Sequence, residues 1–223
     1  MNLIYYMSLL FILFFIIFLI DKDRNKAPKK IRIFLGLSLI VLFIKNLALI
    51  FMCIIKNIEI IYVLKNFIYL DYLIIPVIIL NLYYIYLRFD NINFNRIYGI
   101  TTIMFFIYLI FIYKIEGTIK LDASLGYFIV LNNENIIKAI LIFIIGILLL
   151  GGAVFLDKPN SNKTGIIITM TVLGFMIIEN MLIMFKVWIF PYCIISEILL
   201  LFVINNSLNT FNKIWYKYVF FIS

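Results

Sequence analysis

Long apolar stretches, separated by short polar connections, dominate this chain. Seven of them approach or exceed the ~20 residues that a helix needs to cross the ~30 Å hydrocarbon core of a bilayer. They cover residues 3–20, 31–55, 61–87, 97–113, 136–155, 165–185 and 188–205. The stretch 7–20 is apolar on all sides and lacks the alternation of a membrane β-strand, which predicts helices. The predicted fold is an all-α integral membrane protein, a seven-transmembrane helix bundle that forms a single domain over residues 1–223.

The composition is also typical of an integral membrane protein. Of the 223 residues, 66% are hydrophobic and only 13% are charged, whereas soluble domains carry about 25% charged residues. No basic segment precedes the first apolar stretch and no small-residue cleavage site follows it, which favours a retained helix over a signal peptide. We therefore expect a multi-pass protein of the cell membrane, with the lipid bilayer as a partner.

The distribution of Lys and Arg predicts the orientation. Most of the 19 basic residues fall in the first, third and fifth connections and in the C-terminal tail. They are Lys22, Arg24, Lys26, Lys29, Lys30, Arg32, Arg88, Arg96, Lys158, Lys163, Lys213 and Lys217. Because cytoplasmic loops are enriched in Lys and Arg, this places the N-terminus outside and the C-terminus in the cytoplasm. The tail 206–223 is predicted to lie at the headgroups, and anionic headgroups account for the net charge of +8 without a nucleic-acid partner.

Four ionisable side chains interrupt the apolar stretches: Lys45, Asp71, Glu179 and Glu197. An unpaired charge at that depth costs ~2.5–3.5 kcal/mol, so such residues mark candidate functional sites. A rise of ~1.5 Å per residue places all four in the outer half or the middle of the bundle. We therefore predict one polar binding site in a crevice that opens to the outside.

The pairing within this site is predicted from helix order. Lys45 and Asp71 lie on consecutive antiparallel helices, so they are expected to form an ion pair. Glu179 and Glu197 lie on another consecutive pair, and one of two neighbouring acids is expected to hold a proton. The alternative is an ion pair that serves only packing, beside glutamates that do no chemistry.

Three further residues are assigned to the site from their positions. Asn46 and Asn180 each follow a charged residue and are predicted to line the crevice. Pro76 removes the donor that would bond the Tyr72 carbonyl and is the predicted hinge. Pro191 is expected in the first turn of the last helix, where proline is tolerated.

The connection between the fourth and fifth predicted helices carries two β-prone runs. Residues 117–122 and 127–131 flank a short Ser- and Gly-containing segment, which predicts a small extracellular β-hairpin. Because a two-stranded hairpin is marginal alone, it would rest on the helix ends as a cap or lid. An irregular loop, or an early start of the fifth helix, is the alternative.

The sequence contains no histidine and only two cysteines, which excludes several kinds of catalytic and metal-binding site. Zinc sites of the HExxH kind, Ser-His pairs and haem-ligating histidines are excluded, and no cofactor or metal is expected. Cys53 and Cys193 lie near the outer ends of their helices, where a disulfide is conceivable, but the favoured interpretation is two small residues that face lipid or the core. The sequence shows no pairing of a nucleophile with a base, so we do not expect an enzyme. An intramembrane enzyme is the least favoured function.

Two family resemblances bear on function. The run Tyr69-Leu-Asp-Tyr72 with Pro76, and Gly126-Tyr127-Phe128 before the fifth helix, resemble the seven-helix sensor region attached to many bacterial histidine kinases. Since the chain stops soon after its last helix, this resemblance implies a sensing module that signals through a separate partner. The series Asp71, Pro76 and Asn81 is also similar to the third helix of microbial rhodopsins. That family requires a lysine where Glu197 stands, so retinal is not expected.

Two functions are favoured over the remaining alternative, a structural or immunity-type membrane protein. The first is a membrane sensor or ligand-binding module with an outward-facing polar crevice. The second is a small ion- or proton-coupled transporter or channel that uses the same intramembrane charges. No inverted repeat or matched pair of broken helices is visible in the sequence, which favours the sensor.

Overall fold

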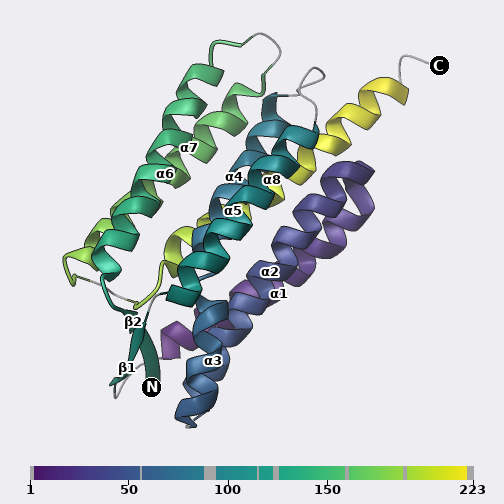
Figure 1. The fold of residues 1–223 in the computed structure, drawn as a ribbon. Helices are drawn as coiled ribbons and strands as arrows, with labels where there is room; N and C mark the ends of the chain where they lie inside the picture. The colour runs from purple at the N-terminus through teal and green to yellow at the C-terminus, as the bar shows by residue number, and fades with distance from the viewer. Residues whose placement is uncertain are drawn as a thin grey trace.

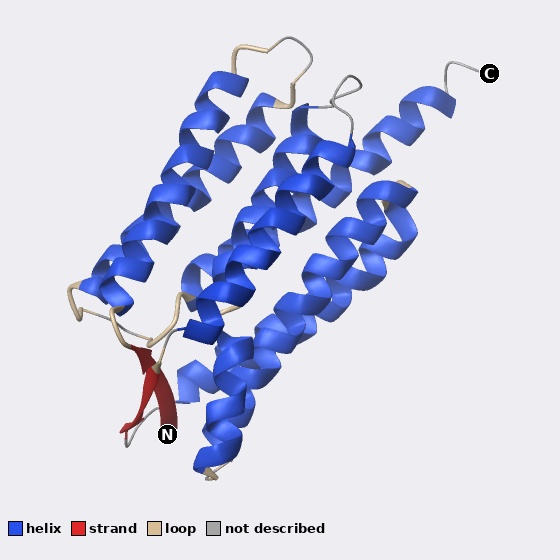
Figure 2. Ribbon diagram, in the orientation of Figure 1, coloured by secondary structure: helices blue, strands red, loops and turns tan. Residues whose placement is uncertain are grey.

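Helices make up nearly all of the computed structural model, shown in Figures 1 and 2. It describes residues 3–55, 57–87, 94–114, 116–122, 126–158, 161–187 and 190–219. In these ranges the helices are α1 (Leu3–Lys26), α2 (Lys29–Ile54), α3 (Ile58–Ile68), α4 (Asp71–Leu87), α5 (Phe94–Lys114), α6 (Glu134–Phe155), α7 (Lys163–Met184) and α8 (Ile194–Val219). With α3 and α4 counted as one, 6 of these helices are long and apolar enough to cross a membrane. The chain is a multi-pass helical membrane protein, which confirms the predicted class.

The third predicted helix, 61–87, forms as two helices, α3 and α4. The break lies at Tyr69 and Leu70, where the Leu70 amide donates to the Phe67 carbonyl in a tighter turn. Pro76, the predicted hinge, lies inside α4, which continues through it. Pro76 has no amide to donate to the Tyr72 carbonyl, but the break lies further toward the N-terminus, between α3 and α4.

The last helix also differs from its predicted bounds. The predicted start at residue 188 lies outside the described residues, and α8 begins at Ile194. Pro191 therefore precedes the helix instead of occupying its first turn. The predicted tail 206–223 continues α8 as helix to Val219, and residues 220–223 lie outside the described ranges.

The central element of the bundle is α4. It contacts α2, α5, α6, α7 and α8, and most of its side chains from Leu73 to Leu87 are buried. The outer helices bury one stripe each and expose large apolar side chains such as Phe14 and Phe143. Since lipid is as apolar as these side chains, their exposure fits a bundle surrounded by a bilayer.

The predicted hairpin is confirmed. Strands β1 (Gly117–Asp122) and β2 (Gly126–Leu131) pair antiparallel. Gly126 has a φ of 86°, a conformation that favours glycine. Ile129 and Leu131 are buried, and the hairpin contacts α2 and α3. The hairpin and the start of α1 lie at one end of the bundle, and the end of α8 lies at the other (Figure 1).

Candidate functional site

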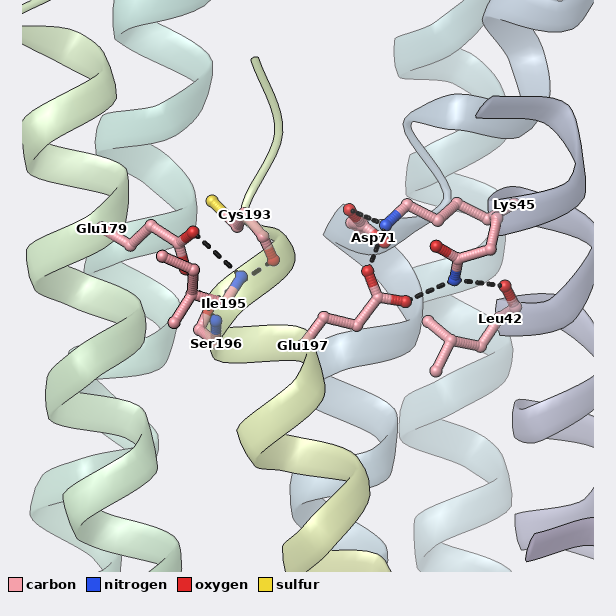
Figure 3. A network of polar contacts seen from close by, with 9 residues as sticks. Leu42, Lys45, Asp71, Glu179, Cys193, Ile195, Ser196 and Glu197 are labelled. Carbon is pink, nitrogen blue, oxygen red and sulfur yellow. Dashed lines mark hydrogen bonds and ion pairs between the residues drawn. The ribbon is translucent and has the colours of Figure 1, made fainter. Parts of the chain in front are cut away.

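Lys45 is the centre of a buried charge cluster that joins α2, α4 and α8 (Figure 3). Its Nζ lies 3.0 Å from Asp71 Oδ2 and 2.6 Å from Glu197 Oε2. The Lys45 side chain is 0% exposed, that of Glu197 2% and that of Asp71 17%. Asn46, the next residue on α2, donates to the other Glu197 oxygen and to the Leu42 carbonyl. We call Lys45, Asn46, Asp71 and Glu197 the charge cluster.

The charge cluster holds one cation and two acids, a net charge of −1 when all three are ionised. Burying ions costs several kcal/mol each, and short paired contacts offset that cost. Among the described residues, Asp71 Oδ1 and Asn46 Oδ1 are buried without a hydrogen-bond partner. A cavity of about 30 Å³ lies against Asp71 and is also lined by Glu134, Lys138 and Asn180. A void of that size has room for a water molecule.

The predicted ion pair between Lys45 and Asp71 is present, but the predicted pair of neighbouring acids is not. Glu197 binds Lys45 and Asn46. Glu179 lies on the other side of α8 from these residues and points toward the start of α8 (Figure 3). Helix order along the chain does not predict this arrangement, because α8 also packs against α4, which is distant in sequence. The structure therefore brings Lys45, Asp71 and Glu197 together and leaves Glu179 apart.

Glu179 caps the N-terminus of α8. Its Oε1 accepts a hydrogen bond from the Ile195 amide at 3.2 Å, and its Oε2 accepts one from the Ser196 amide at 2.8 Å. The first amides of a helix lack partners within the helix, and the helix dipole favours a negative charge there. Asn180 donates to the Met176 carbonyl of its own helix. The charge of Glu179 is thus explained by capping.

Glu179→Ala is expected to lower the free energy of unfolding by about 0.5–2 kcal/mol, the usual range for a lost N-terminal cap. Glu179→Gln is expected to lose less, because its amide oxygen still accepts one bond. Equilibrium unfolding in mixed micelles measures both variants. Glu116→Ala, at an exposed position outside the bundle core, is the matched control. Equal stability of Glu179→Ala and the parent would contradict the capping role.

Two tyrosines bind the hairpin at Ile129. The Tyr69 hydroxyl donates to the Ile129 carbonyl at 2.7 Å, and the Ile129 amide donates to the Tyr192 hydroxyl oxygen at 3.3 Å. Tyr69 lies at the α3–α4 break, just before Asp71, and Tyr192 lies just before α8, which carries Glu197. No local sequence signal indicates this link, because Tyr69 and Tyr192 are distant in sequence from Ile129.

A crevice of about 530 Å³ opens between the hairpin and the ends of α6 and α7. Polar side chains in its lining include Lys120, Asn133, Glu134 and Lys186. It shares Glu134 with the small cavity at Asp71, and Glu134 is bound there by Lys138 in an ion pair. The crevice and the charge cluster are thus neighbours on the hairpin side of the bundle.

The cysteines and the acids do not assemble into a metal site in the described ranges, where no group of three or more Cys, Asp and Glu residues could hold an ion. Cys53 and Cys193 are not joined by a disulfide. Burial raises the pKa of the Cys193 thiol, which therefore stays protonated near neutral pH and is a poor nucleophile.

Known proteins offer no further guide to the site. A comparison with models of protein families finds no match, and no curated protein sequence matches the chain. Its function therefore has to be inferred from the residues and their geometry.

Proposed function

We propose that the protein is a membrane sensor that binds a ligand on the hairpin side and signals through a separate partner. Its proposed topology has seven spans, with α3 and α4 as one, and places the hairpin outside. The basic residues Lys22, Arg24 and Lys163 lie at the ends of α1 and α7 that face away from the hairpin, which supports this orientation (Figure 1). The resemblance of the run Tyr69–Tyr72 to the sensor region of bacterial histidine kinases also supports the proposed function.

The observation that carries this proposal is the double attachment of the hairpin at Ile129. Through Tyr69 and Tyr192, the hairpin is bonded to the segments that lead into α4 and α8. These helices supply Asp71 and Glu197, the two acids that bind Lys45 on α2. A ligand that moves the hairpin would shift both acids relative to Lys45. Signalling requires a ligand that binds one arrangement of the bundle more tightly than another. The two tyrosine bonds would meet this requirement by coupling the position of the hairpin to the arrangement of the acids.

The surroundings of α4 favour a sensor over an open pathway. Beyond Asp71, its residues 73–79 are all buried, and they are aliphatic or proline. An apolar, tightly packed layer of this kind resists the passage of ions, because an ion would lose its hydration there. The same layer is rigid enough to carry a displacement along the helix.

A small proton- or cation-coupled transporter is the second candidate. The net charge of −1 in the charge cluster favours it, together with the buried Asp71 Oδ1 that lacks a partner among the described residues. A proton or a monovalent cation would neutralise that charge. The cavity beside Asp71 provides the space for such an exchange.

Ion flux in proteoliposomes separates the two candidates. The sensor predicts that the wild type and Asp71→Asn both leak protons, sodium and potassium no faster than protein-free liposomes, as measured with a pH-sensitive dye and ion-selective electrodes. Flux in the wild type that Asp71→Asn abolishes would overturn the sensor in favour of the transporter.

The double variant Tyr69→Phe, Tyr192→Phe is expected to exchange its backbone amide hydrogens faster at the starts of α4 and α8. Each substitution removes one bond to Ile129, and a neutral hydrogen bond contributes about 1 kcal/mol, or roughly a fivefold change in local opening. Hydrogen exchange of the protein in lipid nanodiscs, followed by mass spectrometry, measures the change.

Tyr83→Phe is the matched control for this experiment. It also removes one tyrosine hydroxyl, which donates to the Leu148 carbonyl on α6 at 2.9 Å. Exchange at the start of α8 should be unaffected by it. If the double variant speeds exchange in the hairpin alone, the proposed link between the hairpin and the charge cluster is wrong.

A further inference from the structure

The crevice under the hairpin carries more positive than negative charge. Lys120 on β1 and Lys186 just beyond α7 are both exposed and line it. The acid in its lining, Glu134, is already bound by Lys138. Lys120 and Lys186 have no acidic partner among the described residues. Two cations thus remain to attract an anion into the crevice.

The backbone at Lys186 supports a role in binding. Lys186 has a φ of 60°, and Asn133 one of 65°; these are the non-glycine residues with positive φ in the described ranges, and both line the crevice. Lys186 ends α7 in a Schellman motif, in which its amide donates to Ile183 and the next amide donates to Leu182, each at 3.0 Å. Glycine is the usual residue at that position, since a side chain is strained there. Strain of this kind is typical of binding sites.

Apolar side chains also line the crevice. In the hairpin, Lys120 pairs with Phe128, so both side chains lie on the same face of the two strands. Ile136 on α6 and Met184 on α7 supply apolar surface on the other side. A volume of about 530 Å³ is within the range of small-molecule sites. A crevice lined by both cationic and apolar side chains matches a ligand with one polar and one apolar part.

We infer that this crevice binds an amphipathic anion. Its carboxylate or phosphate lies between Lys120 and Lys186, and its apolar part lies against Phe128, Ile136 and Met184. The inference rests on the proposed function, because it names the ligand class of the sensor, but binding itself does not require signalling. Two sources share this chemistry: an anionic membrane lipid and a water-soluble amphiphilic acid.

Binding of octyl phosphate to the full chain in phosphatidylcholine nanodiscs tests the soluble source, and replacement of part of that lipid by phosphatidylglycerol tests the lipid source. Protection of the hairpin from hydrogen exchange is the readout in both arms. We expect saturable protection in at least one arm. The double variant Lys120→Gln, Lys186→Gln should weaken it at least tenfold, because each charge-assisted contact contributes about that factor.

Three controls make the experiment decisive. Lys158→Gln removes the same charge beyond α6, at the end away from the hairpin, and should bind normally. Octanol, which has no anionic group, should not protect the hairpin. Lys186→Gly should weaken binding about tenfold while raising the unfolding midpoint, because glycine relieves the positive φ, so its weaker binding cannot be attributed to misfolding.

The inference is overturned if neither arm protects the hairpin, or if the lysine variants bind as tightly as the wild type. The outcome is separable from the proposed function. Charge-dependent binding without any change at the starts of α4 and α8 would leave the ligand site standing and refute the sensor. Faster exchange at the starts of α4 and α8 in the tyrosine variants, together with no anion binding in either arm, would refute the ligand site and leave the sensor standing.

Discussion

Lys45→Met is expected to destabilise the protein by about 3–5 kcal/mol, the range measured when one partner of a buried ion pair is removed. Methionine has a similar length, so the loss comes from charge and not from a cavity. Asp71 and Glu197 would be left facing each other without the cation that now lies 3.0 Å and 2.6 Å from them. Equilibrium unfolding in mixed micelles, with refolding as a check on reversibility, measures the effect.

Two further substitutions are expected to restore the stability that Lys45→Met loses. Adding Asp71→Asn and Glu197→Gln to Lys45→Met is expected to restore much of the lost stability, because no uncompensated charge then remains buried. Lys158→Met, at an exposed position, should change stability by no more than about 0.5 kcal/mol. If the triple variant is less stable than Lys45→Met alone, the hydrogen-bond geometry of the cluster matters more than its charge.

The elements of the fold could be predicted from the sequence because length and composition determine them. An apolar stretch of about 20 residues has few alternatives to a membrane-spanning helix. The hairpin was equally accessible, because its β-prone runs are bounded by Gly117 and Gly126. The pair of Lys45 and Asp71 follows from the short connection after α2, which keeps α2 adjacent to both α3 and α4.

Contacts between helices that are distant in sequence could not be predicted in this way. Glu197 reaches Lys45 because α8 packs against α4, and that packing depends on side chains throughout the bundle. The capping role of Glu179 is not predictable for a related reason. With the predicted helix starting at residue 188, the amides of Ile195 and Ser196 fall inside the helix instead of at its start.

The break at Tyr69 illustrates the same limit within one stretch. Pro76 is the strongest local signal in residues 61–87, yet α4 continues through it. The observed break is further toward the N-terminus, where the Tyr69 hydroxyl bonds to the hairpin. A tertiary hydrogen bond therefore coincides with the break, and sequence alone does not reveal such a bond. The residues that link the hairpin to the charge cluster belong to this less predictable class.

Gly165→Ala is expected to destabilise the protein by about 1–3 kcal/mol, the usual cost of overpacking a core. A Cβ at Gly165 would collide with ring carbons of Tyr86, which is 1% exposed in the centre of the bundle. The ring has little freedom to move, because its hydroxyl donates to the Val203 carbonyl on α8 at 3.3 Å. The variant should therefore separate α7 from α4 or break the contact with α8. Equilibrium unfolding in mixed micelles measures the loss.

Gly174→Ala, in the same helix, is the matched control. A Cβ at Gly174 meets no atom within 4 Å, so this variant should gain about 0.5–1 kcal/mol from the better helix propensity of alanine. In a Tyr86→Leu background, which removes most of the ring, Gly165→Ala should cost less than it does alone. Equal costs in the two backgrounds would mean that the close approach of α7 to Tyr86 is not what requires glycine at 165.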